Sequence, residues 1–126
     1  MSLPTAVSLT DIPAYEGPHA LPGIRFRPAR AHLGVTSWGM NVMELDPYCT
    51  THPEHDHVHD GQEELYVVLS GALTVQLPDG EVAMTAGQML RVAPEHRRKL
   101  VTSEQGATVL ALGGTPGQAF EVTPGM

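Results

Sequence analysis

Glycine and proline interrupt this sequence at short intervals along its whole length, and this spacing limits the secondary structure that the chain can form. The 126 residues include 13 glycines and 11 prolines. Proline lacks the backbone donor that a helix interior requires, and glycine loses more conformational freedom than other residues when it is held in a helix. The stretches between these residues are too short for long helices. We therefore expect no helix longer than one turn.

Several of the uninterrupted stretches have the alternation and the β-branched content that are typical of strands. Residues 36–45 alternate apolar with more polar side chains, and residues 64–70 are rich in β-branched and aromatic ones. About eight short strands with turns every 8–12 residues predict an all-β fold, an antiparallel sandwich or barrel. The expected strands are 24–26, 36–45, 64–70, 72–77, 81–84, 88–92, 97–101 and 107–112, with a last short strand near Phe120.

The length of the chain fits one domain, because domains most often contain roughly 100–150 residues. Residues 1–23 show no sustained hydrophobic period, so we expect an irregular N-terminal arm there and a single β domain at 24–122. Acidic residues outnumber basic ones, 14 to 7, which disfavours nucleic acid as a partner. No apolar run approaches the roughly 18 residues that span a bilayer, so we expect no membrane partner and a cytoplasmic location. Cys49 is the only cysteine, which excludes an intrachain disulfide and a cysteine zinc site.

Four of the seven histidines lie close together, at His52, His55, His57 and His59. On an extended strand the last three would share one face, because side chains alternate along a strand. A turn at 60–61 would then bring Glu63 or Glu64 back beside them as an oxygen ligand. A mixed set of imidazoles and a carboxylate with open positions suits Fe(II), Mn, Ni, Co or Zn better than Mg or Ca. The segment therefore predicts a divalent metal site.

These residues resemble the first motif of the cupin superfamily, which reads His-x-His, three or four residues, Glu, six residues and Gly. Here the motif is matched by His57, His59, Glu64 and Gly71, and the second motif is matched in outline by the segments 79–80, 86–87 and 92–94. The resemblance covers roughly residues 36–112. It implies a small single-domain protein, an antiparallel jelly-roll barrel with the metal inside, and commonly a homodimer.

The resemblance leaves two ligand questions open. The pair His55 and His57 also fits the His-x-His pattern, with a longer spacer to Glu64 than the pair His57 and His59. We retain both pairs as candidate metal ligands. The fourth ligand in cupins is usually a second-motif histidine, but that position holds Arg98 here. Arginine has no lone pair to donate, so it cannot replace a metal ligand. His96 lies two residues earlier and is the candidate substitute.

Arg98 shares a strand face with Leu100, so an inward leucine predicts an inward arginine. Such an arginine needs an anionic partner. We consider two cases: Arg98 pairs with Glu64 or Glu63 in a metal-free pocket, or it anchors a substrate beside a bound metal. His96 and Tyr66 are the other candidate substrate contacts, although the apolar strand around Tyr66 also fits a core position.

The residues and the resemblance together suggest two classes of function. The first is a metal-dependent enzyme of the oxygenase, decarboxylase or isomerase type that acts on a small organic acid or oxygenated molecule. The second is a non-catalytic cupin that binds or senses a small molecule or a metal, with Arg98 paired to Glu64 if no metal is bound. Both classes imply a small-molecule ligand, and neither names it.

Overall fold

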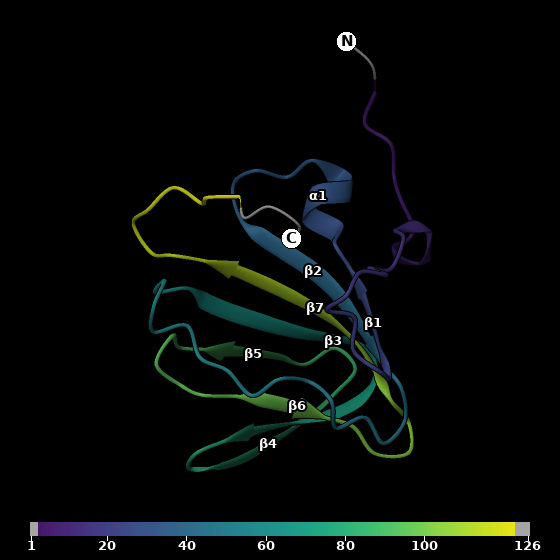
Figure 1. Cartoon of the computed structure of the whole chain (residues 1–126), viewed down its shortest axis with the longest axis vertical. Helices are drawn as coiled ribbons and strands as arrows, with labels where there is room; N and C mark the ends of the chain where they lie inside the picture. Colours follow the sequence, from purple (N-terminus) through teal and green to yellow (C-terminus); the bar gives the residue numbers. More distant parts are fainter. Residues whose placement is uncertain (1–2, 123–126) are drawn as a thin grey trace.

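The computed structural model describes residues 3–122 and shows a fold dominated by antiparallel strands (Figure 1). In this part of the chain the strands are β1 (Ile24–Arg27), β2 (Gly39–Leu45), β3 (Glu63–Leu77), β4 (Gly80–Thr85), β5 (Met89–Val92), β6 (Lys99–Val101) and β7 (Ala107–Gly114). Two short helices, η1 (Leu9–Asp11) and α1 (Ala29–Leu33), precede β2. The arrangement confirms the expected all-β antiparallel jelly-roll barrel.

The long strand β3 connects the two sheets of the barrel. Its N-terminal half lies between β7 and β5, where Tyr66 faces Ala111 on one side and Leu90 on the other. Its C-terminal half lies between β4 and β6 and pairs with both. In Figure 1, β3 runs between the group β1, β2 and β7 and the group β4, β5 and β6. The two halves of one strand therefore fix the position of one sheet relative to the other.

Gly71 does not end a strand, which corrects the expectation of separate strands at 64–70 and 72–77. The register between β3 and β7 shifts between Val68 and Ser70, and Gly71 has a φ of 75°. A β-bulge of this kind inserts one residue and bends the strand without ending the hydrogen-bond ladder. The chain therefore passes from one sheet to the other through a bend instead of a turn.

Two other expectations were wrong. Helix α1 has five residues, slightly more than one turn, because the residues that break helices lie at its ends and not within it. Pro28 precedes the helix, and Gly34 adopts the left-handed conformation at its C-cap with a φ of 79°. The last strand, expected near Phe120, is absent from the described residues, and Phe120 instead lies against Gly39 at the edge of β2.

The core lies between the two sheets, where alternate residues of the strands point inward. Tyr66, Val68, Val75, Leu100 and Val109 are completely or almost completely buried there. Burial of this apolar surface is the main favourable contribution to folding.

The N-terminal arm packs against β1 and β2. Ile12 is 3% exposed and contacts Ala29 and Val42. Arg27 donates a hydrogen bond from Nη1 to the Ile12 carbonyl over 2.7 Å, and the Tyr15 backbone N–H donates to the Phe26 carbonyl over 2.7 Å. These contacts hold the arm close to the barrel, while the division between 1–23 and 24–122 stays a prediction. No helix within residues 3–122 is long and apolar enough to cross a membrane.

Replacing Gly71 by alanine should destabilise the protein strongly. The new Cβ would overlap the carbonyl oxygen of Gly106, and the left-handed backbone conformation disfavours any side chain. We expect the free energy of unfolding, measured by urea denaturation, to fall by at least about 2 kcal/mol. Gly114→Ala is the matched control, because a Cβ at Gly114 meets no atom within 4 Å. Equal stability of the two variants would contradict the role given to Gly71.

Candidate metal centre

The loop between β2 and β3 is held against the approach to β6 by backbone hydrogen bonds. The His55 N–H donates to the Arg98 carbonyl over 3.0 Å, and the Arg98 N–H donates back to the His55 carbonyl over 2.8 Å. The His57 N–H donates to the Pro94 carbonyl over 2.9 Å. Because the loop is extended between His55 and His57, their side chains point to the same side. The alternation ends at His57, where the Gly61 N–H donates to the His57 carbonyl over 2.8 Å and closes a turn.

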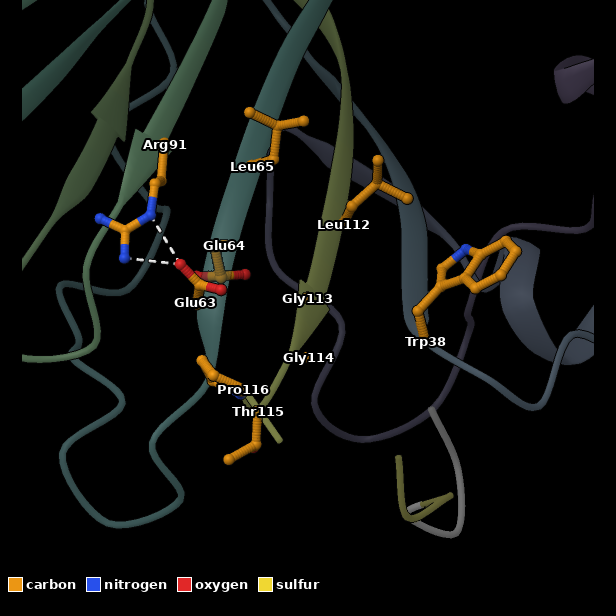
Figure 2. A pocket seen from close by; sticks show the side chains of 10 residues that line it. All are labelled: Trp38, Glu63, Glu64, Leu65, Arg91, Leu112, Gly113, Gly114, Thr115 and Pro116. Carbon is orange, nitrogen blue, oxygen red and sulfur yellow. Dashed lines mark hydrogen bonds and ion pairs between the residues drawn. The ribbon is translucent and has the colours of Figure 1, made fainter. Parts of the chain in front are cut away.

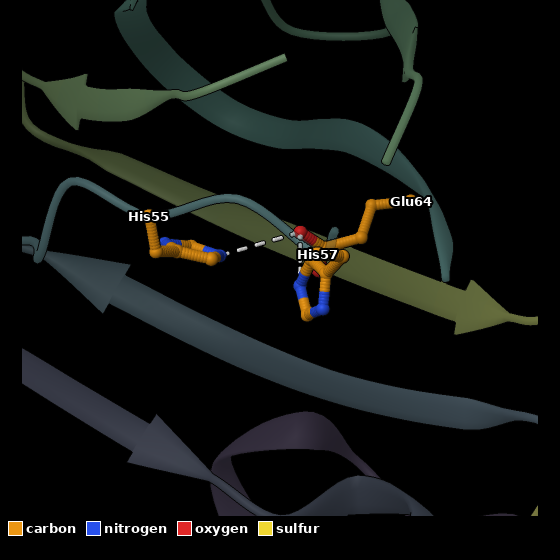
Figure 3. Close-up of side chains that lie close together, drawn as sticks. All are labelled: His55, His57 and Glu64. Carbon is orange, nitrogen blue, oxygen red and sulfur yellow. Dashed lines mark ion pairs between the residues drawn. The ribbon is translucent and has the colours of Figure 1, made fainter. Parts of the chain in front are cut away.

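His55, His57 and Glu64 meet at the start of β3 (Figure 3). One ligand atom from each residue lies within 4.8 Å of the other two. The distance from Glu64 Oε1 is 3.5 Å to His55 Nε2 and 3.2 Å to His57 Nε2. All three side chains are partly buried, so the cluster is reached by solvent but is not on the surface. Sequence spacing left two histidine pairs open, and the structure brings His55 and His57 together with Glu64.

Each imidazole in the cluster has its second nitrogen occupied. His55 Nδ1 lies 2.9 Å from the Pro53 carbonyl oxygen, which can only accept, so Nδ1 carries the proton. His57 Nδ1 lies 3.1 Å from the Asp60 carboxylate and donates to it in the same way. In the neutral tautomers, Nε2 of both rings then presents its lone pair toward Glu64. Metal-binding histidines in proteins usually have this kind of partner for the outer nitrogen.

The charge of Glu64 is balanced by the groups around it. Burial alone would raise the pKa of the Glu64 carboxyl. When the two rings are protonated and no metal is bound, the hydrogen bond donated by His55, the charge of His57 and the Tyr66 hydroxyl together hold that pKa below its ordinary value. The same hydrogen bond to Glu64 raises the pKa of His55. Tyr66 donates from its hydroxyl to Glu64 Oε1 over 2.9 Å. Burial, followed by the charge of Glu64, raises the pKa of Tyr66, so Tyr66 is a neutral proton donor.

The donor set fits a divalent transition metal. Two imidazole lone pairs directed at a carboxylate repel it unless a proton or a metal ion lies between them. Three ligands of this mixed nitrogen and oxygen type leave positions open, a set associated with Fe, Mn, Ni, Co and Zn. The residues that could hold a metal are therefore His55, His57 and Glu64.

The other predicted ligand candidates are not part of this cluster. His59 follows the turn, its side chain is 77% exposed, and its Nε2 lies 3.4 Å from Asp60 Oδ2. His96 lies in an exposed turn before β6. Glu63 points away from His55 and His57, as expected for its place beside Glu64 on a strand. Arg91 donates from Nε to Glu63 Oε2 over 2.6 Å, beside a hollow lined by Leu65, Leu112 and Trp38 (Figure 2).

Arg98 lies behind Glu64 and has an exposed fraction of 0%. Its Nε is 3.7 Å from Glu64 Oε1, and its two Nη atoms each lie 3.4 Å from a backbone carbonyl, of His55 and of Ala93. The inward direction expected from Leu100 is therefore observed. Arg98 does not line the cavity, so a ligand would reach it only by displacing other groups. The geometry gives Arg98 the position of a support for Glu64 and the His55 loop, and its expected contact with substrate stays a prediction.

A cavity of about 750 Å³ opens beside the cluster. Its walls come from the barrel interior, from the N-terminal arm and from the segment after β7. The residues that line it include His55, His57, Glu64, Tyr66, His52, Asp60, Asn41, Met43, Phe26, Tyr15 and Phe120. Sequence reasoning missed the contact of Asp60 with His57 Nδ1 and the contact of His52 Nδ1 with the Leu100 N–H. The three-residue spacing from His57 to Asp60 was the one available signal, since it allows a hydrogen bond across a turn.

Comparison with known proteins agrees with this geometry. The family model described as "Cupin domain" matches residues 41–113, more than half of the chain. A sugar phosphate isomerase from a cupin superfamily of Silicibacter pomeroyi DSS-3 is 24% identical, with a TM-score of 0.72 over 89% of this chain and 77% of that one. The polyketide cyclase RemF from Streptomyces resistomycificus is 18% identical, with a TM-score of 0.72 over 96% and 87%.

A predicted oxalate decarboxylase from Thermotoga maritima is 14% identical, with a TM-score of 0.67 over 86% of this chain and 97% of that one. No curated protein matches the sequence. At these identities the likeness to the three structures concerns the fold.

His52 makes the stability of the protein depend on pH. It is 4% exposed, its Nδ1 accepts a hydrogen bond from the Leu100 N–H over 3.1 Å, and burial lowers its pKa to about 4. The unfolded chain binds a proton below about pH 6.5, whereas the folded protein keeps His52 neutral down to about pH 4. As the pH is lowered from about 6.5 to about 4, the titration of His52 should therefore reduce the free energy of unfolding by up to about 3 kcal/mol.

His52→Asn tests this contribution, because an asparagine oxygen can accept the same hydrogen bond and does not titrate. Urea denaturation at pH 7 and pH 4.5 should show a smaller loss of stability for this variant than for wild type. His96→Asn, which replaces an exposed histidine, serves as the control. The same loss for wild type and His52→Asn would rule out this contribution.

Proposed function

This chain belongs to the cupin domain family, and we propose that it is a metal-dependent enzyme with its centre at His55, His57 and Glu64. The observation that carries the proposal is the arrangement of the two imidazoles. Their Nδ1 atoms are committed to Pro53 and Asp60, and their Nε2 atoms both face Glu64 at the wall of a cavity. In a solvated surface loop with no ligand, we would not expect both imidazole rings to be held in fixed orientations by hydrogen bonds.

The ligand of the proposed enzyme is a small oxygenated molecule that enters the 750 Å³ cavity. A bound divalent metal, Fe, Mn, Ni or Zn, would supply Lewis acidity toward the ligand's oxygen atoms. Asp60 and Pro53 orient the two imidazoles, and Arg98 holds positive charge behind Glu64. Tyr66 stays protonated and donates a hydrogen bond to Glu64 Oε1, which fixes the orientation of the carboxylate. Three structural relatives are named as an isomerase, a cyclase and a predicted decarboxylase. These names support isomerisation or decarboxylation as the type of reaction.

A second candidate is a binding or sensor protein without turnover. The observation in its favour is the complete burial of Arg98 with its Nε 3.7 Å from Glu64 Oε1. A guanidinium in that place can balance the carboxylate without a metal. Association as a homodimer and a cytoplasmic location stay predictions under both candidates.

Metal binding should depend on His57 and not on His59. We expect wild type, stripped of metal and dialysed against Mn(II), Fe(II), Ni(II) or Zn(II), to retain about one ion per chain by elemental analysis. His57→Ala removes one of three ligands, so its affinity in calorimetric titration should fall by at least about 100-fold, beyond the 10–100-fold typical of losing an outer partner. His59→Ala is the matched control and should bind as wild type does. Equal loss in both variants, or no binding by wild type, would refute the proposed centre.

Solvent deuterium exchange separates the enzyme from the binding protein. Isomerases, decarboxylases and many cyclases move a proton at a carbon beside a carbonyl group. The metal-loaded protein should therefore incorporate deuterium into some members of a panel of hydroxyketones and 2-oxo acids, detected by NMR, and His57→Ala should not. Metal binding without exchange in any compound would favour the binding protein.

A further inference from the structure

The floor of the cavity is formed by β2, β7 and the N-terminal half of β3, and its side chains are small in the centre. The registers of these strands align residues across the sheet in rows. Two rows face the cavity, and they read Gly39–Gly113–Glu64 and Asn41–Ala111–Tyr66. The middle position of each row is glycine or alanine. The larger side chains stand at the ends: Glu64 in the first row, whose other end is Gly39, and Asn41 and Tyr66 in the second. This pattern leaves a flat, open floor between Glu64 and Asn41.

The aromatic side chains of the protein gather around this floor. The chain contains one tryptophan, three tyrosines and two phenylalanines. Four of these six line the cavity: Tyr15, Phe26, Tyr66 and Phe120. Tyr66 is also a member of the main core and Phe26 packs against it, whereas Tyr15 and Phe120 belong to neither core cluster. Stability of the core therefore does not account for the place of Tyr15 and Phe120, and aromatic side chains around a cavity indicate a flat, apolar ligand.

Asn41 places an unused acceptor at the end of the floor opposite Glu64. It lies on β2, on the same inward face as Met43, and lines the cavity. Its Oδ1 is buried and accepts no hydrogen bond from residues 3–122. A buried acceptor without a donor costs about 1–3 kcal/mol. A hydrogen-bond donor on a bound ligand would remove that cost once the amide turns Oδ1, which solvent does not reach in this structure, toward the cavity.

The distance between the two ends of the floor sets the size of the ligand. Asn41 is on β2 and Glu64 is on β3, with β7 between them. Two spacings between neighbouring strands amount to about 10 Å, and the side chains at each end reach inward and shorten the gap. A molecule with one or two fused rings spans it.

We propose that the ligand of this site is a planar, aromatic-sized molecule with two adjacent oxygens at the His55–His57–Glu64 end and a hydroxyl group that donates to Asn41 Oδ1 at the other. Asn41 is then the residue that selects for the hydroxyl. This inference rests on the proposed function, because the two adjacent oxygens need a metal at the cluster. To the proposed function it adds the class of substrate and the residue, Asn41, that recognises the hydroxyl group of that substrate.

Aromatic hydroxamic acids test the inference, because the hydroxamate group binds metals through two adjacent oxygens. The probes are benzohydroxamic acid with its 4-hydroxy and 4-methoxy derivatives, and 2-naphthohydroxamic acid with its 6-hydroxy and 6-methoxy derivatives. Dissociation constants are measured by calorimetry on Zn(II)-loaded protein. For at least one ring size, the hydroxyl should tighten binding to wild type by about 10-fold, the value of one well-made hydrogen bond, and the methoxy group should not.

The variants Asn41→Leu and Asn41→Ala should lose this gain from the hydroxyl while binding the unsubstituted acid at least as tightly as wild type. Met43→Leu, an apolar change on the same strand face, should keep the gain. Binding of the unsubstituted acid also reports that each variant is folded.

The outcomes separate this inference from the proposed function. If the unsubstituted acids bind only to Zn(II)-loaded protein and the hydroxyl gives no gain in either series, the inference is overturned and the metal centre stands. A gain that persists in both Asn41 variants also overturns it. If Zn(II) itself does not bind, both fail together.

Discussion

The negative charge of Glu64 is the constraint on which the rest of the site depends. Its side chain is 15% exposed, so water solvates the carboxylate only weakly. An unbalanced charge in such a place would be strongly unfavourable. His55, His57, Tyr66 and Arg98 all approach the same oxygen, Oε1, at 3.5, 3.2, 2.9 and 3.7 Å. The fold gathers these groups by the β3 pairings and by the reciprocal backbone hydrogen bonds between His55 and Arg98.

With an arginine at position 98, the centre offers three protein ligands to a metal instead of four. By the spacing of the second motif, Arg98 is expected at the position where cupins usually have a histidine, and arginine cannot bind a metal. Arg98 contributes a fixed positive charge beside the carboxylate, one side-chain hydrogen bond to the His55 carbonyl and one to the Ala93 carbonyl after β5. Three ligands leave more open positions on a metal than four do. A bound ligand can then contribute more than one oxygen, which fits the flat floor that runs from Glu64 to Asn41.

Much of the fold was predictable, because turns and alternation are local properties of a sequence. The strands from β4 to β7 begin and end within a few residues of their expected bounds. The sequence predicts a turn at Gly71, since it does not distinguish a left-handed glycine in a bulge from one in a hairpin. The choice between His55 and His59 was also beyond the sequence, because it depends on where the loop stops being extended. That point is set by Pro94, which accepts from the His57 N–H and is distant in the chain. The role proposed for Asn41 could not be predicted from the sequence, because it depends on the absence of a hydrogen-bond donor to its Oδ1.

Anomalous diffraction from crystals grown with Co(II) or Zn(II) tests the central claim most directly. The account predicts one strong peak inside the barrel, about 2.0–2.2 Å from Nε2 of His55, Nε2 of His57 and an oxygen of Glu64, with Arg98 still behind the carboxylate. Peaks only at surface histidines such as His59 or His96, with Glu64 in direct contact with Arg98, would contradict it.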